Sequence, residues 1–325
     1  MIEHRISLTA HGGPEVLEWQ DVDLPPPGPG EVRMRTGAAG LNFIDVYHRT
    51  GLYPQDLPSG LGIEAAGTVE AVGAGVSEWR EGDRVGVCSG PLGAYATARN
   101  VPAGLLARIP AAVSDEVAAA VLLKGATTEA LVERCARVQP GWPVLVHAAA
   151  GGVGLLLVQW LKHIGAVVIG TVGSAAKAEM ARTAGADHVI TYDQDDVAVA
   201  VRELTGGEGV KVVFDGVGAA TWQASVAATA RRGLIVSFGN ASGPVTGVSM
   251  ASLSAAGSLF ATRPTLFDYY REPAERAAGF ARLFDLVTNG TLSVRIGQRF
   301  ALQDAADAHR ALEARETTGS TVLLP

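Results

Sequence analysis

The chain has 325 residues, of which 48% are hydrophobic and 18% charged, and its formal net charge is −7. This length favours two domains, and the composition is that of a globular protein with enough apolar residues for sizeable cores. The acidic balance argues against broad electrostatic binding of nucleic acid. Two cysteines, Cys88 and Cys135, exclude a disulfide framework and a four-cysteine zinc lobe, and they suit a reducing compartment.

The sequence predicts no membrane segment. Its first ten residues contain no apolar signal region, and no stretch reaches the roughly 18 apolar residues that span a bilayer. We therefore expect a cytoplasmic protein.

The first third of the chain predicts short strands between glycine-rich turns. Residues 31–35, 65–72 and 84–87 carry β-branched residues bounded by glycine. The proline-rich residues 25–30 predict an extended connector, because they can form neither a helix nor a central strand. The pattern then changes, and residues 114–116 predict the start of a helix before an alanine run.

From residue 141 onward, strands and helices alternate regularly. The expected strands cover residues 144–146, 166–172, 188–192, 210–214, 234–238 and 259–261. The expected helices cover residues 153–164, 175–184, 197–204 and 222–230, and two later ones cover 275–288 and 304–315. This alternation predicts a parallel sheet that is covered by helices on both faces.

Residues 147–154, HAAAGGVG, connect the first of these strands to its helix. They match the dinucleotide-binding pattern G-x-G-x-x-G, with Ala149 in place of the first glycine. One glycine would let the backbone approach a pyrophosphate, another would let the helix pack against the strand, and the helix N-terminus favours an anion. A tight turn without ligand is the alternative, but the strand before the loop and the helix after it favour dinucleotide binding. The expected loop contacts are Gly151, Gly152, Val153 and Gly154.

The second strand of the alternation indicates which dinucleotide is bound. NAD sites have an acidic residue about 20 residues after the loop, which bonds the ribose 2′-hydroxyl. Here no carboxylate occurs near that place before Glu179, which already lies inside the expected helix. The strand end offers groups that suit the 2′-phosphate of NADPH instead. The expected contacts are Gly173, Ser174, Lys177 and Tyr192; a solvated lysine and a packing tyrosine are the alternatives for the last two.

Several longer motifs resemble the medium-chain dehydrogenase/reductase superfamily. They are GPEVL from residue 13, GLNFID from residue 40, GIEAAG from residue 62 and GDRV from residue 82. Four further stretches are similar to its quinone oxidoreductase, or zeta-crystallin-like, branch: LNFIDVYHRTGLYP, HAAAGGVG, VSFGNASGPV and TTGSTVLLP. The resemblance spans essentially the whole chain.

This resemblance implies an α/β protein with two domains. A β-rich GroES-like catalytic domain would cover residues 1–122 and 266–325. A Rossmann domain, with a doubly wound parallel sheet that binds NADPH, would cover residues 123–265. Such proteins are typically homodimers that pair edge strands of their cofactor domains, here near residues 259–263, which would also cover a vulnerable sheet edge.

The zinc enzymes of this superfamily use a cysteine and a histidine as catalytic ligands. At the corresponding places this chain has Asn42 and Ile63. Neither residue supplies a thiolate or an imidazole, so we expect no catalytic metal. Glu64, next to the second of these places, is expected to be a structural hydrogen-bond acceptor.

Without a metal, the nicotinamide is expected to supply the chemistry and to pass a hydride to a quinone or to the β-carbon of an enone. The protein must then hold donor and acceptor together and polarise a carbonyl. By resemblance, two of the candidate residues lie near the nicotinamide, Asn42 and Tyr47. A turn residue or a half-buried aromatic is the structural alternative. The full catalytic set is Asn42, Tyr47, Tyr53 and Thr127.

The resemblance of these motifs to the family implies further cofactor contacts. They are Asn42 itself, Phe238, Gly239 and Asn240 at one strand end, Thr262 and Arg263 at the next, and Arg315 toward the phosphates. The chain departs from its relatives at Glu129 and Ala130, where a tyrosine is usual. A carboxylate there would change the polarity of the pocket, and an alanine would enlarge it.

Three functions remain compatible with the sequence. The leading one is an NADPH-dependent quinone reductase, by a one- or a two-electron route. An NADPH-dependent reductase of α,β-unsaturated ketones or aldehydes would share its hydride mechanism. A non-catalytic NADPH-binding protein, structural or RNA-binding, is opposed by the acidic charge and by the presence of Asn42 and Tyr47.

Overall fold

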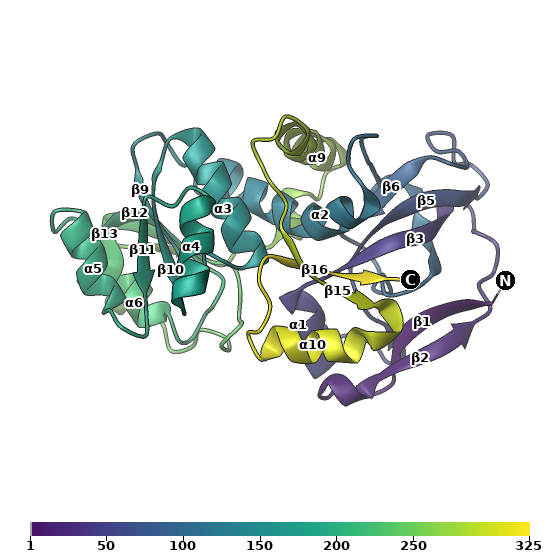
Figure 1. The fold of residues 1–325 in the computed structure, drawn as a ribbon, viewed down its shortest axis with the longest axis horizontal. Helices are drawn as coiled ribbons and strands as arrows, with labels where there is room; N and C mark the ends of the chain where they lie inside the picture. Colours follow the sequence, from purple (N-terminus) through teal and green to yellow (C-terminus); the bar gives the residue numbers. More distant parts are fainter. Residues whose placement is uncertain (1) are drawn as a thin grey trace. The chain divides into compact units, whose positions relative to one another are not determined.

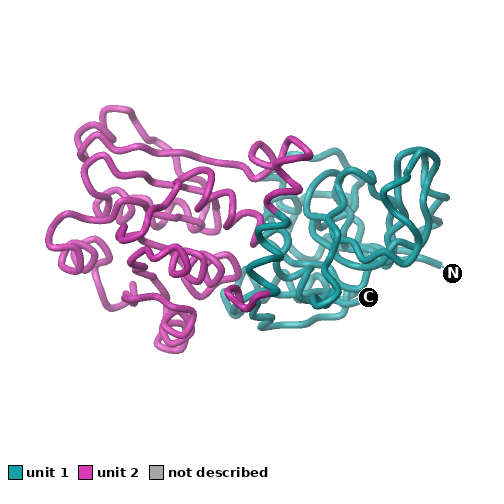
Figure 2. The backbone as a smooth tube through the Cα atoms, turned by 90° about the horizontal axis from the view of Figure 1, so that it is seen from above, with its two compact units in different colours: residues 1–124, 280–288, 294–325 teal, residues 125–279, 289–293 magenta. Residues whose placement is uncertain are grey.

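A computed structural model describes residues 2–325, which divide into two compact units (Figure 2). Unit 1 contains the chain up to residue 124 together with residues 280–288 and 294–325. Unit 2 contains residues 125–279 and 289–293. The domain boundaries expected from the sequence, after residues 122 and 265, stay a prediction.

Unit 1 is built on two sheets (Figure 1). The smaller one has the order β2-β1-β4, with β1 (Glu3–Leu8), β2 (Leu17–Val22) and β4 (Ser59–Gly60). The larger one has the order β15-β16-β3-β5-β6-β8, with β7 also paired to β3. Its strands are β3 (Glu31–Leu41), β5 (Glu64–Val72), β6 (Arg84–Val87), β7 (Ala98–Pro102), β8 (Ala107–Arg108), β15 (Ile296–Ala301) and β16 (Ser320–Leu324).

Strand β3 organises unit 1. Its first half alternates buried Val32 and Met34 with the partly exposed Arg33 and Arg35, and its last four residues are all buried. Such alternation is typical of a strand with one solvent-exposed and one buried face, and it stops where the strand enters the core. The buried end delivers the chain directly to helix α1 (Phe43–Thr50).

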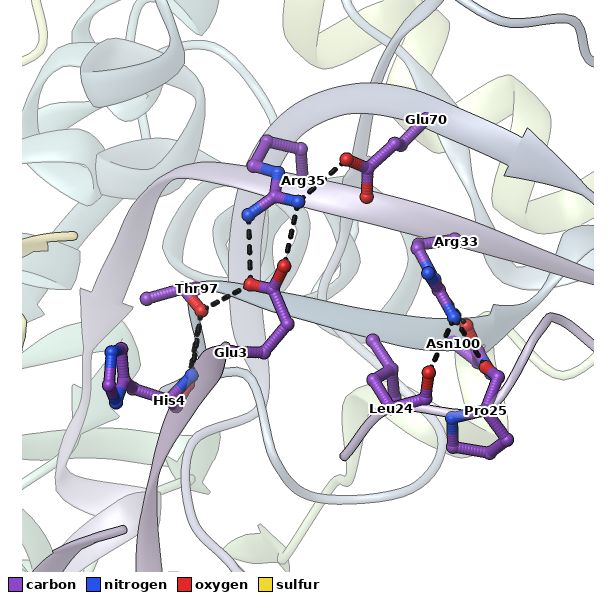
Figure 3. A network of polar contacts seen from close by, with 9 residues as sticks. All are labelled: Glu3, His4, Leu24, Pro25, Arg33, Arg35, Glu70, Thr97 and Asn100. Atoms are coloured by element: carbon purple, nitrogen blue, oxygen red, sulfur yellow. Dashed lines mark hydrogen bonds and ion pairs between the residues drawn. The ribbon is translucent and has the colours of Figure 1, made fainter. Parts of the chain in front are cut away.

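The arginines of β3 fix the N-terminal strand and the proline-rich connector (Figure 3). Arg35 donates to both carboxylate oxygens of Glu3, at 2.8 Å each. Burial alone would raise the pKa of Glu3, but its hydrogen bond from Arg35 helps to hold that pKa below the ordinary value. Arg33 donates to the backbone carbonyls of Leu24 and Pro25. The connector is therefore held by side chains, since its prolines cannot donate to a sheet.

Unit 2 contains one parallel sheet in the order β11-β10-β9-β12-β13-β14. Helices α3 and α4 lie on one side of this sheet, and α5 and α6 on the other (Figure 1). The winding reverses beside β9, where open parallel sheets bind ligands at the carboxyl ends of their strands. The elements are β9 (Pro143–Val146), α3 (Gly152–Ile164), β10 (Val167–Val172), α4 (Ala175–Thr183), β11 (His188–Thr191), α5 (Val197–Leu204), β12 (Val210–Asp215), α6 (Trp222–Ala228), β13 (Thr229–Ser237), α7 (Met250–Ala255), β14 (Phe260–Thr262) and α8 (Leu266–Tyr269).

Each predicted strand and helix of the alternation is present, mostly within one or two residues of its expected bounds, with one larger shift; α7 and α8 were not predicted. The helix expected over residues 222–230 ends at Ala228, and β13 begins at Thr229 instead of near residue 234. Thr229 is buried and pairs with Val210 of β12, so sheet pairing outweighs the helical pattern there.

Three further helices involve unit 1 or the passage between the units. They are α2 (Asp115–Glu129), α9 (Pro273–Thr288) and α10 (Ala305–Glu313). Helix α2 continues into a π-helical turn over Ala130–Cys135. Among residues 2–325, no helix combines the length and the hydropathy needed to cross a bilayer.

Candidate active site

The glycine loop joins β9 to α3 in unit 2 and is held by backbone hydrogen bonds. His147 N–H donates to the Phe214 carbonyl at 3.0 Å, and Ala149 N–H donates to the Thr171 carbonyl at 3.0 Å. Gly151 is the N-cap of α3 and supplies no side-chain cap. The first N–H groups of a 13-residue helix are thus left to a ligand or to solvent, which is the arrangement that binds phosphate groups.

Gly151 and Gly154 have different roles in this loop. A Cβ on Gly154 would lie 2.2 Å from the Ala148 carbonyl oxygen, so the absence of a side chain lets α3 pack against the loop. A Cβ on Gly151 would lie 3.3 Å from the same oxygen and meet no other atom within 4 Å. The space beside Gly151 is therefore a cradle that any side chain would fill. The loop fits the pyrophosphate of a dinucleotide.

A buried polar network supports the loop from the sheet side. His147 Nδ1 lies 3.0 Å from Thr171 Oγ1, and His147 Nε2 lies 3.0 Å from Ser225 Oγ. Ser225 donates to Asp215, which is fully buried at the end of β12 and also accepts two backbone N–H groups. Burial lowers the pKa of His147, although the Asp215 carboxylate partly opposes this. The sequence analysis overlooked Asp215, whose signal is its position between a strand and a glycine.

The proposed 2′-phosphate contacts come together at the carboxyl ends of β10 and β11. Ser174 is the N-cap of α4, and its Oγ accepts the Lys177 N–H at 3.3 Å. A Cβ on Gly173 would lie 2.3 Å from the Tyr192 hydroxyl oxygen, so this phenol packs directly over the glycine. The N-terminus of α4, the Ser174 hydroxyl and the Tyr192 phenol thus lie close together, and Lys177 belongs to the first turn of the same helix. Such a region favours an anion.

The other strand ends of the sheet also carry candidate contacts. Phe238 N–H donates to the Asp215 carbonyl at 2.8 Å, which brings residues 238–240 beside the end of β12. Arg263 Nη1 donates to the carbonyls of Ser237 and Gly239, at 3.1 and 2.8 Å. The Arg263 side chain thereby ties β14 to this turn. That the backbones of Thr262 and Arg263 contact the cofactor stays a prediction.

In unit 1, Asn42 and helix α1 form a second group of candidates. Asn42 is the extended N-cap residue of α1. Its N–H donates to Asp45 Oδ2 at 2.8 Å, and Asp45 N–H donates to the Asn42 carbonyl at 3.0 Å. Gly51 ends the helix with a φ of 80°, a left-handed conformation that favours glycine. The side chains of Asn42 and Asp45 also accept each other's backbone N–H in a capping box, which places Asn42 at a fixed point after β3.

Two tyrosines follow from the same helix. Tyr47 is 7% exposed, and its ring lies 5.2 Å from that of the half-buried Tyr53 in an edge-to-face arrangement. Tyr53 N–H donates to the Tyr47 carbonyl at 3.0 Å. Tyr47 and Tyr53 are thus brought together by α1 and the turn after it, and Asn42 begins the same helix.

Buried charges behind α1 hold its position. Arg49 is 1% exposed and donates to both oxygens of Glu313 at 2.8 Å. Its Nη1 also lies 3.0 Å from His309 Nδ1, and burial together with this guanidinium lowers the pKa of His309 to about 3. Tyr95 donates to Asp45 Oδ2 at 2.8 Å. Asp45 and Tyr95 were missed by the sequence analysis, although the Asn-x-x-Asp spacing is a capping signal.

The remaining candidates belong to other elements. Thr127 is partly buried in the second half of α2, within unit 2, and Arg315 is exposed in unit 1 after α10. Glu129, the departure noted in the sequence, is 4% exposed and accepts from Arg134 at 2.9 and 3.0 Å and from Tyr270 at 3.2 Å. Its carboxylate is therefore neutralised within unit 2. Burial raises the pKa of Glu129 even so.

The donor set of unit 1 does not suit zinc. Glu64 is fully buried and accepts from Asn42 Nδ2, Leu123 N–H and Lys124 Nζ, at 2.8, 2.7 and 3.3 Å. This is the structural acceptor that the sequence predicted. No group of three His, Cys, Asp or Glu side chains within residues 2–325 could hold a metal ion. The absence of catalytic zinc stays a prediction, which a metal assay of the purified protein tests.

Comparison with known proteins gives matches along the whole chain. Residues 28–111 match the alcohol dehydrogenase GroES-like domain, and residues 152–276 match the zinc-binding dehydrogenase family. A quinone oxidoreductase of Pseudomonas aeruginosa is 52% identical, and the alignment covers 99% of each chain. A 2-haloacrylate reductase of a Burkholderia species is 44% identical, over 97% of this chain and 96% of the relative.

The fold is also similar to solved structures. The crystal structure of Escherichia coli quinone oxidoreductase complexed with NADPH superposes with a TM-score of 0.97. The two chains are 46% identical, and the match covers 99% of this chain and 100% of the other.

Proposed function

The chain belongs to the quinone oxidoreductases of the medium-chain dehydrogenase/reductase superfamily, and from this membership we propose that it reduces quinones with NADPH. The predicted fold class, a GroES-like β-rich part and a Rossmann parallel sheet, is confirmed by the same matches and by the sheet order. The observation that carries the proposal is similarity at about half identity to quinone oxidoreductases over nearly the full length.

We propose that NADPH is held along the strand ends of unit 2. Residues 151–154 would bind the pyrophosphate through backbone N–H groups. Ser174 and Lys177 would bind the 2′-phosphate, with Gly173 and Tyr192 beside them. Residues 238–240, Thr262 and the Arg263 backbone would contact the nicotinamide half, and Arg315 a phosphate. The uncapped N-terminus of α3 and the missing acid after β10 support this assignment.

The bound nicotinamide supplies a hydride to an electron-poor carbon or oxygen of the substrate, which then takes up a proton. The chain's own residues would position the acceptor and stabilise the charge that develops on its oxygen. Tyr47 and Tyr53 offer phenolic O–H donors from one packed pair. Asn42 is fixed at the start of the same helix, and Thr127 is a further candidate for lining the substrate site.

A second candidate function is the reduction of α,β-unsaturated carbonyl compounds. The similarity to a 2-haloacrylate reductase favours it. A panel of 1,4-benzoquinone, 9,10-phenanthrenequinone and small enones, with NADPH as donor and product analysis, separates the two. Quinone turnover at least ~10-fold higher in kcat/KM supports the quinone assignment, since ~1.4 kcal/mol of transition-state discrimination is needed. Faster enone reduction would reject it.

A non-catalytic role in binding RNA is the third candidate, and the charge of −7 opposes it. Tight NADPH binding, no turnover with any acceptor and salt-sensitive RNA binding would together favour it.

We further propose that two copies pair along β14 into a homodimer. This strand lies at the edge of the unit 2 sheet, and Phe260 on it is 62% exposed. Met250, on the helix before β14, is 82% exposed. An open strand edge with exposed apolar residues favours pairing with a second copy. We also propose that residues 1–122 with 266–325, and residues 123–265, are the catalytic and cofactor domains.

A further inference from the structure

The loop between β9 and α3 contains a residue in an unusual backbone conformation. Ala148 has a φ of 52°, a left-handed conformation that alanine adopts only where its surroundings hold it there. Its carbonyl accepts the Gly151 N–H at 2.9 Å, which closes the turn ahead of α3. The residues on either side of Ala148 both bind Thr171 of β10. His147 Nδ1 lies 3.0 Å from Thr171 Oγ1, and the Ala149 N–H donates to the Thr171 carbonyl at 3.0 Å.

Close packing also brings this turn against β10. A Cβ on Gly170 would lie 2.8 Å from the Ala149 Cβ, so the glycine leaves room for the loop. The next residue of the strand, Thr171, is 1% exposed. Strand β10 ends at Val172 and continues directly into the proposed 2′-phosphate contacts at residues 173 and 174. The contacts with Thr171 therefore join the proposed pyrophosphate loop to the strand end that carries the proposed 2′-phosphate site.

A chain of hydrogen bonds determines which ring nitrogen of His147 carries the proton. Asp215 is fully buried and is surrounded by donors, which are the backbone N–H groups of residues 217 and 218 and the Thr221 hydroxyl. A carboxylate gives no hydrogen, so the Ser225 hydroxyl must donate its only one to Asp215 Oδ2, at 2.9 Å. Ser225 Oγ can then only accept from His147 Nε2, which lies 3.0 Å away.

The His147 ring is therefore the Nε2–H tautomer. Burial lowers the pKa of His147 despite the Asp215 charge, which favours the neutral ring with a single N–H. With that N–H at Nε2, the unprotonated Nδ1 accepts from the Thr171 hydroxyl. The hydrogen bonds all run one way, from Thr171 through His147 and Ser225 to the carboxylate at the end of β12. All of these residues belong to unit 2.

We propose that Asp215, Ser225 and His147 are positioning residues. They hold the turn at Ala148 against β10, and so set the distance between the pyrophosphate loop and the 2′-phosphate site. None of the three is more than 3% exposed, so they act on a ligand through the loop. This inference rests on the proposed binding of NADPH and refines it. A ligand that spans both sites needs their spacing, whereas a ligand that occupies one site does not.

NMR of protein with 15N-labelled histidines tests the direction of the chain. The His147 resonance is identified by its loss in His147→Gln. In the unmodified protein we expect a proton on Nε2 and none on Nδ1. In Asp215→Asn the amide oxygen must stay with the two backbone N–H groups, so its NH2 group faces Ser225, which then donates to Nε2. The ring proton should therefore move to Nδ1 in this variant.

The wild-type spectrum decides the tautomer even if Asp215→Asn does not fold. A proton on Nδ1 in the wild type, or an unchanged tautomer in folded Asp215→Asn, would overturn the proposal.

Ser225→Ala breaks the chain without changing the loop sequence. The probes are NADPH, which would span both sites, and 2′-AMP, which would occupy only the 2′-phosphate site. We expect the Kd of NADPH to rise about 10-fold, or 1.4 kcal/mol, and the Kd of 2′-AMP to change less than about 2-fold. Isothermal titration calorimetry measures both. Equal losses for the two probes would indicate a merely structural role, and either that result or an unchanged NADPH Kd would overturn the proposal.

Thr205→Val is the matched control in the same unit. Thr205 Oγ1 donates to the Val201 carbonyl at 2.7 Å and accepts the Gly209 N–H at 2.8 Å, just before β12 begins. The substitution removes a bonded hydroxyl at the opposite end of the strand from Asp215 and should leave both Kd values unchanged. Weaker NADPH binding here would assign the loss in Ser225→Ala to general destabilisation and overturn the proposal.

The positioning and the proposed function fail separately. A protein that binds NADPH but reduces no quinone would contradict the proposed function, whereas the tautomer and the two Kd values would still decide the positioning. A quinone reductase with a proton on Nδ1 of His147 would keep the function and overturn the positioning.

Discussion

We propose that the preference for NADPH depends on two side chains at the start of α4, Ser174 and Lys177. Ser174→Asp keeps an N-cap acceptor for the helix but places a negative charge against the 2′-phosphate. Lys177→Ala removes an ammonium whose charge-assisted bond is worth about 1.5–3 kcal/mol. We expect each change to lower the ratio of kcat/KM for NADPH over NADH by about 10-fold or more.

Steady-state kinetics with both cofactors, at saturating quinone, measures this ratio. Lys211→Ala is the matched control, since Lys211 is exposed on β12 in the same unit. An unchanged ratio in both site variants would reject the 2′-phosphate assignment while leaving the pyrophosphate site untouched.

A second residue-scale prediction concerns Asp45, which is fully buried beside Asn42. Burial raises the pKa of Asp45 to about 7, and the nearby charge of Glu64 also raises it. The hydrogen bonds from Tyr95 and from the Asn42 N–H, and the charge of Lys124, lower this pKa in part. The folded pKa lies above the unfolded value near 4, so the native state retains a proton that the unfolded chain releases. Stability should therefore fall as pH rises from about 4 to 7.

Asp45→Asn stays neutral over this range, and its single oxygen can still accept both hydrogen bonds. From pH 5 to pH 8 the wild type should lose about 2 kcal/mol of unfolding free energy relative to this variant. Urea denaturation at four pH values measures the difference. Asp307→Asn, at an exposed pair with Arg310, should show no such trend, and parallel curves for wild type and Asp45→Asn would contradict the burial argument.

At the scale of elements, two glycine variants at the junction of β9 and α3 distinguish the effect on stability from the effect on cofactor binding. Gly154→Ala places a methyl group 2.2 Å from the Ala148 carbonyl, so the helix must move away from its strand. We expect a loss of several kcal/mol of stability and no NADPH binding. Gly151→Ala meets only one atom, at 3.3 Å, and its backbone is extended. It should keep its Tm within about 2 °C but bind NADPH at least ~10-fold more weakly.

Thermal unfolding and fluorescence titration of the two variants check this contrast. If Gly151→Ala bound NADPH as tightly as the wild type, the cradle beside Gly151 would not be the pyrophosphate site.

The sequence predicts the elements of unit 2 well because each strand and helix is signalled locally. Hydrophobic runs, glycines and capping residues predict the strands β9 to β14 in their chain order. Residues 147–154 alone predict the glycine loop. The early start of β13 is not, because Thr229 becomes a strand residue only by pairing with Val210 across the sheet. Long-range pairing leaves no local pattern.

The polar groups behind the site could not be derived from the sequence for the same reason. Asp215 and His147 meet through Ser225, and Asp45 meets Tyr95 from a distant segment. The side chain of Asn42 donates to Glu64, which lies 22 residues away in the chain. Residue type suggested that Asn42 could polarise a carbonyl; only its partners show that its N–H groups are already engaged.

At the scale of the whole molecule, the proposed dimer depends on the free edge of β14. Phe260→Lys adds a charge to this edge, which blocks strand pairing between copies. We expect size-exclusion chromatography with light scattering to report a monomer near the chain mass of 33.5 kDa for this variant and twice that mass for the wild type. Val199→Lys, at an exposed residue of α5, should remain dimeric. A monomeric wild type would contradict the proposed dimer. A dimeric Phe260→Lys variant would show that the interface lies elsewhere.

The most direct test of the proposed function is the oxidation of NADPH and of NADH by the purified protein, followed at the nicotinamide absorbance with 1,4-benzoquinone as acceptor. We predict turnover with NADPH at a kcat/KM at least ~10-fold above that with NADH, which corresponds to ~1.4 kcal/mol. Equal use of both cofactors would contradict the 2′-phosphate site. No oxidation of either, despite tight NADPH binding, would contradict the assignment as a quinone reductase.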